Sequence, residues 1–147
     1  MPRPLTPRER FDFLNETRVA MLSVASGDAR PPLTVPVWYA VQDDGNLFFF
    51  TGATGIPVRK TALIQRAGVV TLAVQREEPP YKYVTVECSL VEMHQPPSAE
   101  QLLSVASRYL AERQAQGFVR GTLKRATPHL VGFTLKPERW NTLDFGA

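Results

Sequence analysis

Residues 33–51 read LTVPVWYAVQDDGNLFFFT, and this stretch decides the fold. Two runs rich in β-branched and aromatic residues, 33–41 and 47–51, flank a short polar segment. That segment, Asp43–Asn46, contains a glycine and has the composition of a tight turn. The pattern predicts two consecutive antiparallel strands. Because proline donates no ladder hydrogen bond, Pro36 predicts a sheet edge or a bulge in the first strand.

Strands are predicted on both sides of this stretch as well. They are mostly apolar or alternate between apolar and polar residues, and they cover 19–25, 69–74, 81–93, 130–136 and 140–145. In the longest of them, Val84, Val86 and Cys88 fall on one face, and Tyr83 and Thr85 fall on the other. Mostly sequential strands with helices only at insertions favour a mainly β fold, a small antiparallel barrel of about six strands. A length of 147 residues suits a single domain over 1–147.

Three helices are predicted at the insertions. Thr6 and Glu9 have the spacing of a capping box, with proline between them, and predict a helix that runs to Glu16. A small-residue loop, 52–57, leads into a short helix over 58–65. A second capping box at Ser98 and Gln101 predicts the longest helix, 99–116, with Gly117 as its end.

Composition excludes several classes of protein. Hydrophobic residues make up 44% of the chain and charged residues 21%, which is typical of a globular domain rather than a disordered one. No apolar run approaches the roughly 20 residues of a membrane helix, and the first residues lack a secretory signal, so we expect a cytoplasmic protein that does not bind membranes. His94 and His129 lack metal-ligand spacing, and no metal is predicted. Cys88 excludes an intrachain disulfide and is expected to be a buried, inert thiol.

One segment has the composition of a binding site. Residues 51–60 read TGATGIPVRK: a strand end with a hydroxyl, two glycines, and a helix that begins near two cations. Backbone amides at a helix N-terminus bind anions, and Arg59 with Lys60 suits a phosphate monoester. The alternative is an ordinary loop followed by a solvated helix face. In that case both cations would oppose the helix dipole without an anion to offset them.

A second segment, 35–39, offers a flat apolar surface to an aromatic ring. Pro36 frees a ladder position, and Trp38 and Tyr39 follow it directly. The alternative is that Trp38 and Tyr39 are simply aromatic residues of the core and its rim, and residue type alone favours this alternative.

Taken in order, these segments resemble the pyridoxamine 5′-phosphate oxidase-like split-barrel superfamily, and in particular its small flavin- and deazaflavin-dependent oxidoreductases. Each motif is weak by itself, and their order and spacing over roughly 11–145 make the combination specific. The segments that carry the resemblance are 13–24, 30–39, 47–51, 58–60, 79–87 and 136–140.

The resemblance implies a homodimer of split barrels, with each cofactor in a groove between the subunits. Arg59 and Lys60, helped by Thr51, would hold the phosphate. Gly55 stands where the family often has serine, and Thr54 would supply the missing hydroxyl. The other implied residues would surround the ring, Trp140 from the partner subunit. The full set of implied cofactor-binding residues is Val35, Pro36, Val37, Trp38, Phe50, Thr51, Thr54, Arg59, Lys60 and Trp140.

The implied function is that of an oxidoreductase using FMN or coenzyme F-420, a deazaflavin, to transfer hydride to a small conjugated organic substrate. The cofactor itself supplies the hydride chemistry. The excess of arginine favours the deazaflavin slightly, and the sequence leaves the choice open. No catalytic acid or base can be assigned, which keeps a non-catalytic carrier or sensor as an alternative. A barrel for single-stranded nucleic acid, stacking bases on Trp38, Tyr39 and Tyr83, is disfavoured because the cations are not aligned with those aromatics.

Overall fold

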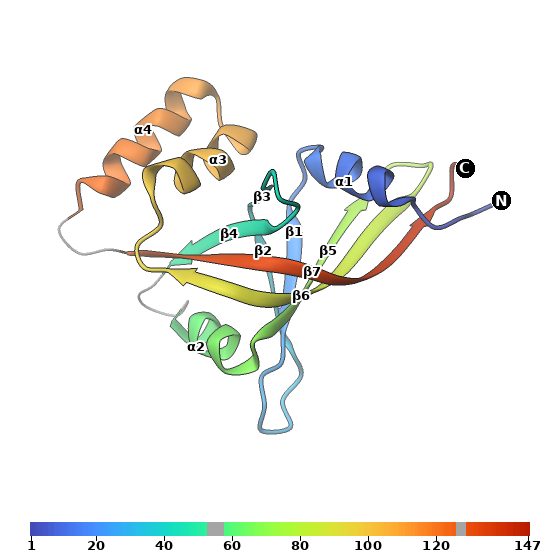
Figure 1. Ribbon diagram of the computed structural model, residues 1–147, viewed down its shortest axis with the longest axis horizontal. Helices are drawn as coiled ribbons and strands as arrows, with labels where there is room; N and C mark the ends of the chain where they lie inside the picture. Colours follow the sequence, from blue (N-terminus) through green and yellow to red (C-terminus); the bar gives the residue numbers. More distant parts are fainter. Residues whose placement is uncertain (53–57, 126–128) are drawn as a thin grey trace.

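Seven antiparallel strands form one sheet in the computed structural model, which describes residues 1–52, 58–125 and 129–147. In chain order they are β1 (Ala20–Val24), β2 (Leu33–Val37), β3 (Tyr39–Val41), β4 (Leu47–Gly52), β5 (Val69–Arg76), β6 (Lys82–His94) and β7 (Leu130–Asp144). Across the sheet the order is β2-β1-β5-β6-β7-β4-β3 (Figure 1). The predicted mainly β, antiparallel split-barrel class is confirmed, with seven strands instead of six.

The curl of the sheet follows from its connectivity. β2 and β3 are the two edge strands, yet Trp38 alone separates them in the sequence. The sheet therefore curls until its two edges meet at this residue, as in a barrel with one open seam. Pro36 lies on β2, which pairs only with β1 among the described strands, so the predicted edge position is confirmed.

Two strand predictions were wrong in detail. The run 33–41 is not one strand, because the chain leaves the first edge of the sheet at Val37 and joins the other edge at Tyr39. The predicted last pair of strands is one continuous strand, β7. There Pro137 pairs with Cys88 and Arg139 pairs with Glu87, which leaves Glu138 as the extra residue of a bulge. The bulge accommodates a proline inside a paired strand.

The inside of the barrel is a continuous apolar core. Val84, Val86 and Cys88 of β6 are buried, as their alternation predicts. Phe49 of β4 stacks on its paired residue Phe133 of the neighbouring strand β7, with ring centroids 5.1 Å apart, and both rings are buried. The barrel is therefore filled by its own side chains, and a ligand site must lie on its outside or at its seam.

Four helices, in the residues that the structure describes, surround the sheet: α1 (Pro7–Asn15), α2 (Val58–Ala67), α3 (Ala99–Tyr109) and α4 (Glu112–Leu123). Figure 1 shows α1 and α2 on opposite sides of the sheet, and α3 and α4 side by side as a pair. Both predicted capping boxes are present, at Thr6 with Glu9 and at Ser98 with Gln101. None of the described helices has the length and hydropathy needed to cross a membrane.

The predicted helix over 99–116 was wrong. The chain turns extended at Leu110 (φ −118°, ψ 153°), and a second helix starts at Glu112. Gly117 lies inside α4 instead of ending a helix. Residues 110–111 contain neither glycine nor proline, so the break has no local signal. Tertiary contacts stabilise it: Leu102 of α3 and Val119 of α4 pack in one small cluster.

Candidate functional site

A cleft of about 470 Å³ lies where the seam of the sheet meets α2. We call it the Lys60 cleft. Its lining comes from the segment before β1, the β2–β3 junction, the end of β4 and the first turn of α2. The lining residues are Val19, Pro36, Val37, Trp38, Phe50, Thr51 and Lys60. All of these except Val19 were predicted from the sequence, and the structure brings them together from four separate segments.

Two aromatic side chains, Trp38 and Phe50, contribute to the apolar walls of the cleft. Trp38 is 38% exposed although it lies at the junction of two strands. Phe50 stacks on Phe118 of α4, with centroids 5.7 Å apart and ring planes 20° apart, so its ring is held from behind. Such walls suit a flat conjugated ring, which gains from stacking and from loss of contact with water.

Lys60 brings the charge into the cleft. Burial lowers the pKa of its ammonium group. Within residues 1–52, 58–125 and 129–147, no hydrogen bond or ion pair reaches that group. A half-buried cation without a counter-charge costs free energy. An anion such as a phosphate, bound beside Lys60, would remove this cost.

Arg59 points elsewhere. Its Nη2 donates a hydrogen bond to the hydroxyl of Ser26, 3.2 Å away, in the turn between β1 and β2. Arg66 donates to the carbonyl oxygen of the same residue, at 2.8 Å. The two arginines thus fasten α2 to that turn, and Arg59 does not line the cleft. Of the other predicted phosphate contacts, Thr51 lines the cleft and Thr54 lies outside the described residues, as does Gly55.

Two further predicted site residues do not line the cleft. Val35 faces the interior of the barrel and packs against the core. Trp140 lies under α1, where its ring meets Phe11 edge to face at 5.4 Å and the guanidinium of Arg10 lies 5.0 Å from its centroid. A contact of Trp140 with a cofactor would need the groove of a second subunit.

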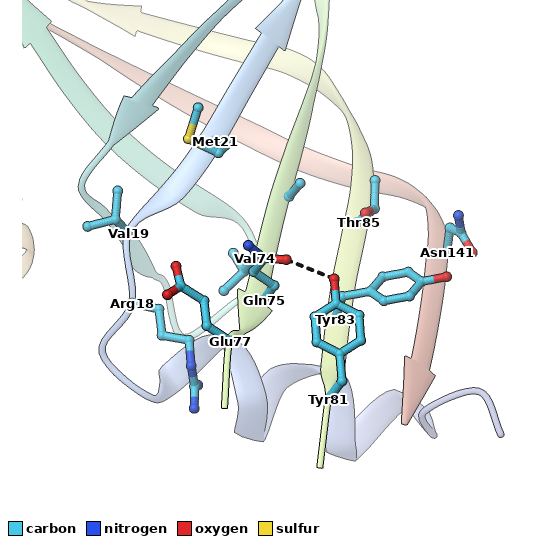
Figure 2. A pocket seen from close by; sticks show the side chains of 11 residues that line it. Arg18, Val19, Met21, Val74, Gln75, Glu77, Tyr81, Tyr83, Thr85 and Asn141 are labelled. Atoms are coloured by element: carbon cyan, nitrogen blue, oxygen red, sulfur yellow. Dashed lines mark hydrogen bonds between the residues drawn. The ribbon is translucent and has the colours of Figure 1, made fainter. Parts of the chain in front are cut away.

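A second, larger hollow of about 780 Å³ lies beside the cleft, on the outer face of β1, β5, β6 and β7 (Figure 2). Val19 lines both the cleft and this larger hollow. The wall of the larger hollow carries hydroxyl and amide groups, and the hydroxyl of Tyr81 donates a hydrogen bond to the side chain of Gln75 at 2.8 Å. The outward face of β6, with Tyr83 and Thr85, was predicted from alternation. Val19 was missed, because nothing in its local sequence distinguishes it from a core valine.

Cys88 lies in the core of the barrel and lines neither hollow. The predicted burial of Cys88 is confirmed, and burial raises the pKa of its thiol to about 12. No group of three or more histidine, cysteine, aspartate or glutamate side chains in the part of the chain that the structure describes is placed to hold a metal ion.

Comparison with known proteins gives matches among solved structures. No protein-family model and no curated protein matches the chain. The conserved hypothetical protein Rv2991 of Mycobacterium tuberculosis superposes with a TM-score of 0.76 at 22% identity, over 96% of this chain and 86% of that one. An F-420 reductase gives a TM-score of 0.69 at 19% identity, over 92% and 98% of the two chains.

An FAD-binding protein of Mesorhizobium loti, mll6688, gives a TM-score of 0.63 at 20% identity, over 98% of both chains. The matches also include candidate pyridoxamine 5′-phosphate oxidases. At the level of the fold, the resemblance to the pyridoxamine 5′-phosphate oxidase-like split barrels is confirmed.

Proposed function

We propose that this split-barrel protein binds FMN or coenzyme F-420 in the Lys60 cleft and uses it to transfer hydride to a small conjugated organic substrate. The cleft carries the proposal, because it combines a half-buried ammonium group with flat apolar walls at Trp38 and Phe50. Both cofactors join a tricyclic ring to a phosphate. Likeness of fold to an F-420 reductase and to an FAD-binding protein supports the proposal.

The residues present fit such a cofactor. Lys60 lacks a counter-charge among the described residues, and a phosphate supplies one. Pro36 donates no backbone hydrogen bond and leaves a smooth apolar surface beside Trp38. A ring laid on this surface would displace water from side chains that now line an open cleft.

When bound, the cofactor supplies the hydride chemistry. This chain's own residues bind and orient it: Lys60 holds the phosphate, and Trp38 and Phe50 fix the plane of the ring and keep water from it. Backbone amides around Val37 would tune the electron-accepting edge of the ring. The arrangement acts through position and exclusion of water.

We also propose that the protein works as a homodimer, with each cofactor in a groove between the subunits. Exposed apolar side chains beside the cleft support this: Val19 is 47% exposed and Met21 41%. Both line the larger hollow on the outer face of the sheet. A second subunit on that face would cover these side chains and bring its own residues to the cleft.

A carrier or sensor that binds the cofactor without turnover is the second candidate. The observation that favours it is the chemistry of the cleft: Lys60 is the one titratable side chain among its described lining residues. Mixing the protein, loaded with reduced cofactor, with quinone and nitroaromatic acceptors separates the two functions. Rapid reoxidation supports the enzyme, and an inert reduced protein across the panel supports the carrier.

Titration with FMN and with riboflavin, which lacks the phosphate, tests the site. Lys60→Ala should weaken FMN binding by about 1.5–3 kcal/mol through loss of a charge-assisted contact and leave riboflavin binding nearly unchanged. Lys136→Ala makes the same change of charge at an exposed position on β7 and serves as the matched control. The same titration with F-420 decides which cofactor binds more tightly.

Equal FMN affinity for wild type and Lys60→Ala would contradict the phosphate site. Equal loss of FMN and riboflavin affinity would show that Lys60 supports the fold of the cleft and does not bind the phosphate.

A further inference from the structure

Tyr109, the last residue of α3, supports Trp38 from behind. The two rings stack, with centroids 4.7 Å apart and planes only 10° apart. Trp38 lines the Lys60 cleft and Tyr109 does not, so the tyrosine lies behind the indole as seen from the cleft. One face of the indole is thus held by protein, and the side chain still keeps 38% of its surface exposed.

The hydroxyl of Tyr109 joins two segments that form the walls of the cleft. It donates a hydrogen bond to the carbonyl oxygen of Arg18 at 2.7 Å, and it accepts one from the backbone N–H of Tyr39 at 3.3 Å. Arg18 directly precedes Val19, and Tyr39 directly follows Trp38. One side chain therefore ties together the backbone on either side of the seam.

The position of Tyr109 is itself fixed. α3 ends at this residue, and the next residue, Leu110, is extended. The neighbouring Arg108 donates to the carbonyl oxygen of Leu14 at 2.9 Å, and its guanidinium lies 4.5 Å from the ring centroid of Tyr39. Burial raises the pKa of the Tyr109 hydroxyl above its ordinary value.

We propose that Tyr109 is a positioning residue of the Lys60 cleft, which holds the Trp38 indole flat as a preformed wall for the conjugated ring of the cofactor. The inference rests on the proposed function. A wall that is already ordered loses less conformational entropy when the ring binds, so cofactor affinity depends on a residue that does not touch the cofactor.

The test uses two substitutions and one control. Tyr109→Phe keeps the ring stack and removes the hydroxyl, and Tyr109→Leu removes both. Leu5→Ala is the control, because it removes a buried side chain of the N-terminal segment, where the backbone N–H of Leu5 donates to Thr142, and lowers stability at a residue that does not line the cleft. The chain has two tryptophans, so a Trp140→Phe background makes Trp38 the fluorescent reporter. The first readout is acrylamide quenching of Trp38 fluorescence in cofactor-free protein of the Trp140→Phe background. The second readout is the dissociation constant for FMN, measured with Trp140 intact.

In Tyr109→Leu we expect Trp38 quenching to rise about twofold or more and the FMN dissociation constant to rise about three- to tenfold. Tyr109→Phe should restore most of both readouts, and Leu5→Ala should lower the unfolding midpoint and change neither. Unchanged Trp38 quenching, or unchanged FMN affinity, in folded Tyr109→Leu would overturn the inference alone. Failure of wild type to bind FMN and F-420 would overturn the proposed function itself.

Discussion

At the scale of single residues, Lys60 is a half-buried cation without a counter-charge among the described residues, and we expect it to lower the stability of the cofactor-free protein. Burial lowers its pKa from 10.5, so folding disfavours its charged form. Lys60→Met should therefore raise the free energy of unfolding of cofactor-free protein, on the order of 0.5 kcal/mol for a half-exposed group, while it weakens FMN binding. Urea denaturation of both proteins at pH 7 measures the gain.

The gain has a definite pH dependence. Below the lowered pKa, Lys60 is charged in both the folded and the unfolded chain, and its cost to stability is fully present. As the pH rises through that value, the folded protein releases the proton first, and the cost decreases. The difference between Lys60→Met and wild type should shrink from pH 7 to pH 10.5. A less stable Lys60→Met at pH 7 would mean that the ammonium group has a partner.

Cys88 gives a second prediction at this scale. Its side chain is 1% exposed, and burial raises its pKa to about 12. A thiol reacts as its thiolate, so an aromatic disulfide reagent should modify native Cys88 at least about a hundredfold more slowly than denatured Cys88. Absorbance of the released thiolate measures both rates. Rapid modification of the native protein would show that β5, β6 and β7 separate readily.

At the scale of elements, Gly132 determines how closely β7 packs on β4. A Cβ atom built on it would lie 2.6 Å from the ring of Phe48 and 3.2 Å from Pro97. Phe48 is fully buried, so its ring cannot move into solvent. Gly132→Ala should destabilise the protein by about 1–3 kcal/mol through overpacking. Gly121→Ala, where nothing lies within 4 Å of the new atom, is the control. Equal unfolding midpoints for the two variants would contradict this packing.

At the scale of elements, the sequence could predict the features that depend on residues close together in the chain. Both capping boxes, the 43–46 turn and the alternation on β6 depend on neighbouring residues, and the structure has all of them. The breaks at Trp38 and Leu110 depend on contacts between residues far apart in the chain. Tyr109 is hydrogen-bonded to Arg18, 91 residues away, and no local pattern could show that contact.

The residues of the candidate site also differ in how far the sequence could predict them. Trp38, Phe50 and Lys60 were predicted because they lie in the segments 30–39, 47–51 and 58–60, whose order along the chain carries the family resemblance. Val19 was not, because its place in the cleft depends on how β1 lies against β2. Arg59 was expected beside Lys60, but consecutive residues of a helix point about 100° apart, and its side chain reaches Ser26 instead.

At the scale of the whole molecule, the cleft is a consequence of the way in which the sheet closes. The edges meet at Trp38, and α2 begins next to that seam, so the flat walls and the cation come together only when the barrel is complete. The larger hollow shares Val19 with the cleft and lies on the outer face of the same sheet. A partner covering that face would also close one side of the cleft.

Dimerisation is therefore expected to be coupled to cofactor binding. Met21 is 41% exposed on β1 and lines the larger hollow, so Met21→Arg should place a charge in the interface without disturbing the core. Sedimentation velocity at micromolar concentration should show a dimer for wild type and a monomer for Met21→Arg, and FMN affinity should fall with the loss of the dimer. Leu123→Arg, at a 53% exposed position on α4, is the control and should stay dimeric. A monomeric wild type that binds FMN tightly would place the whole cofactor site within one chain and leave Trp140 outside it.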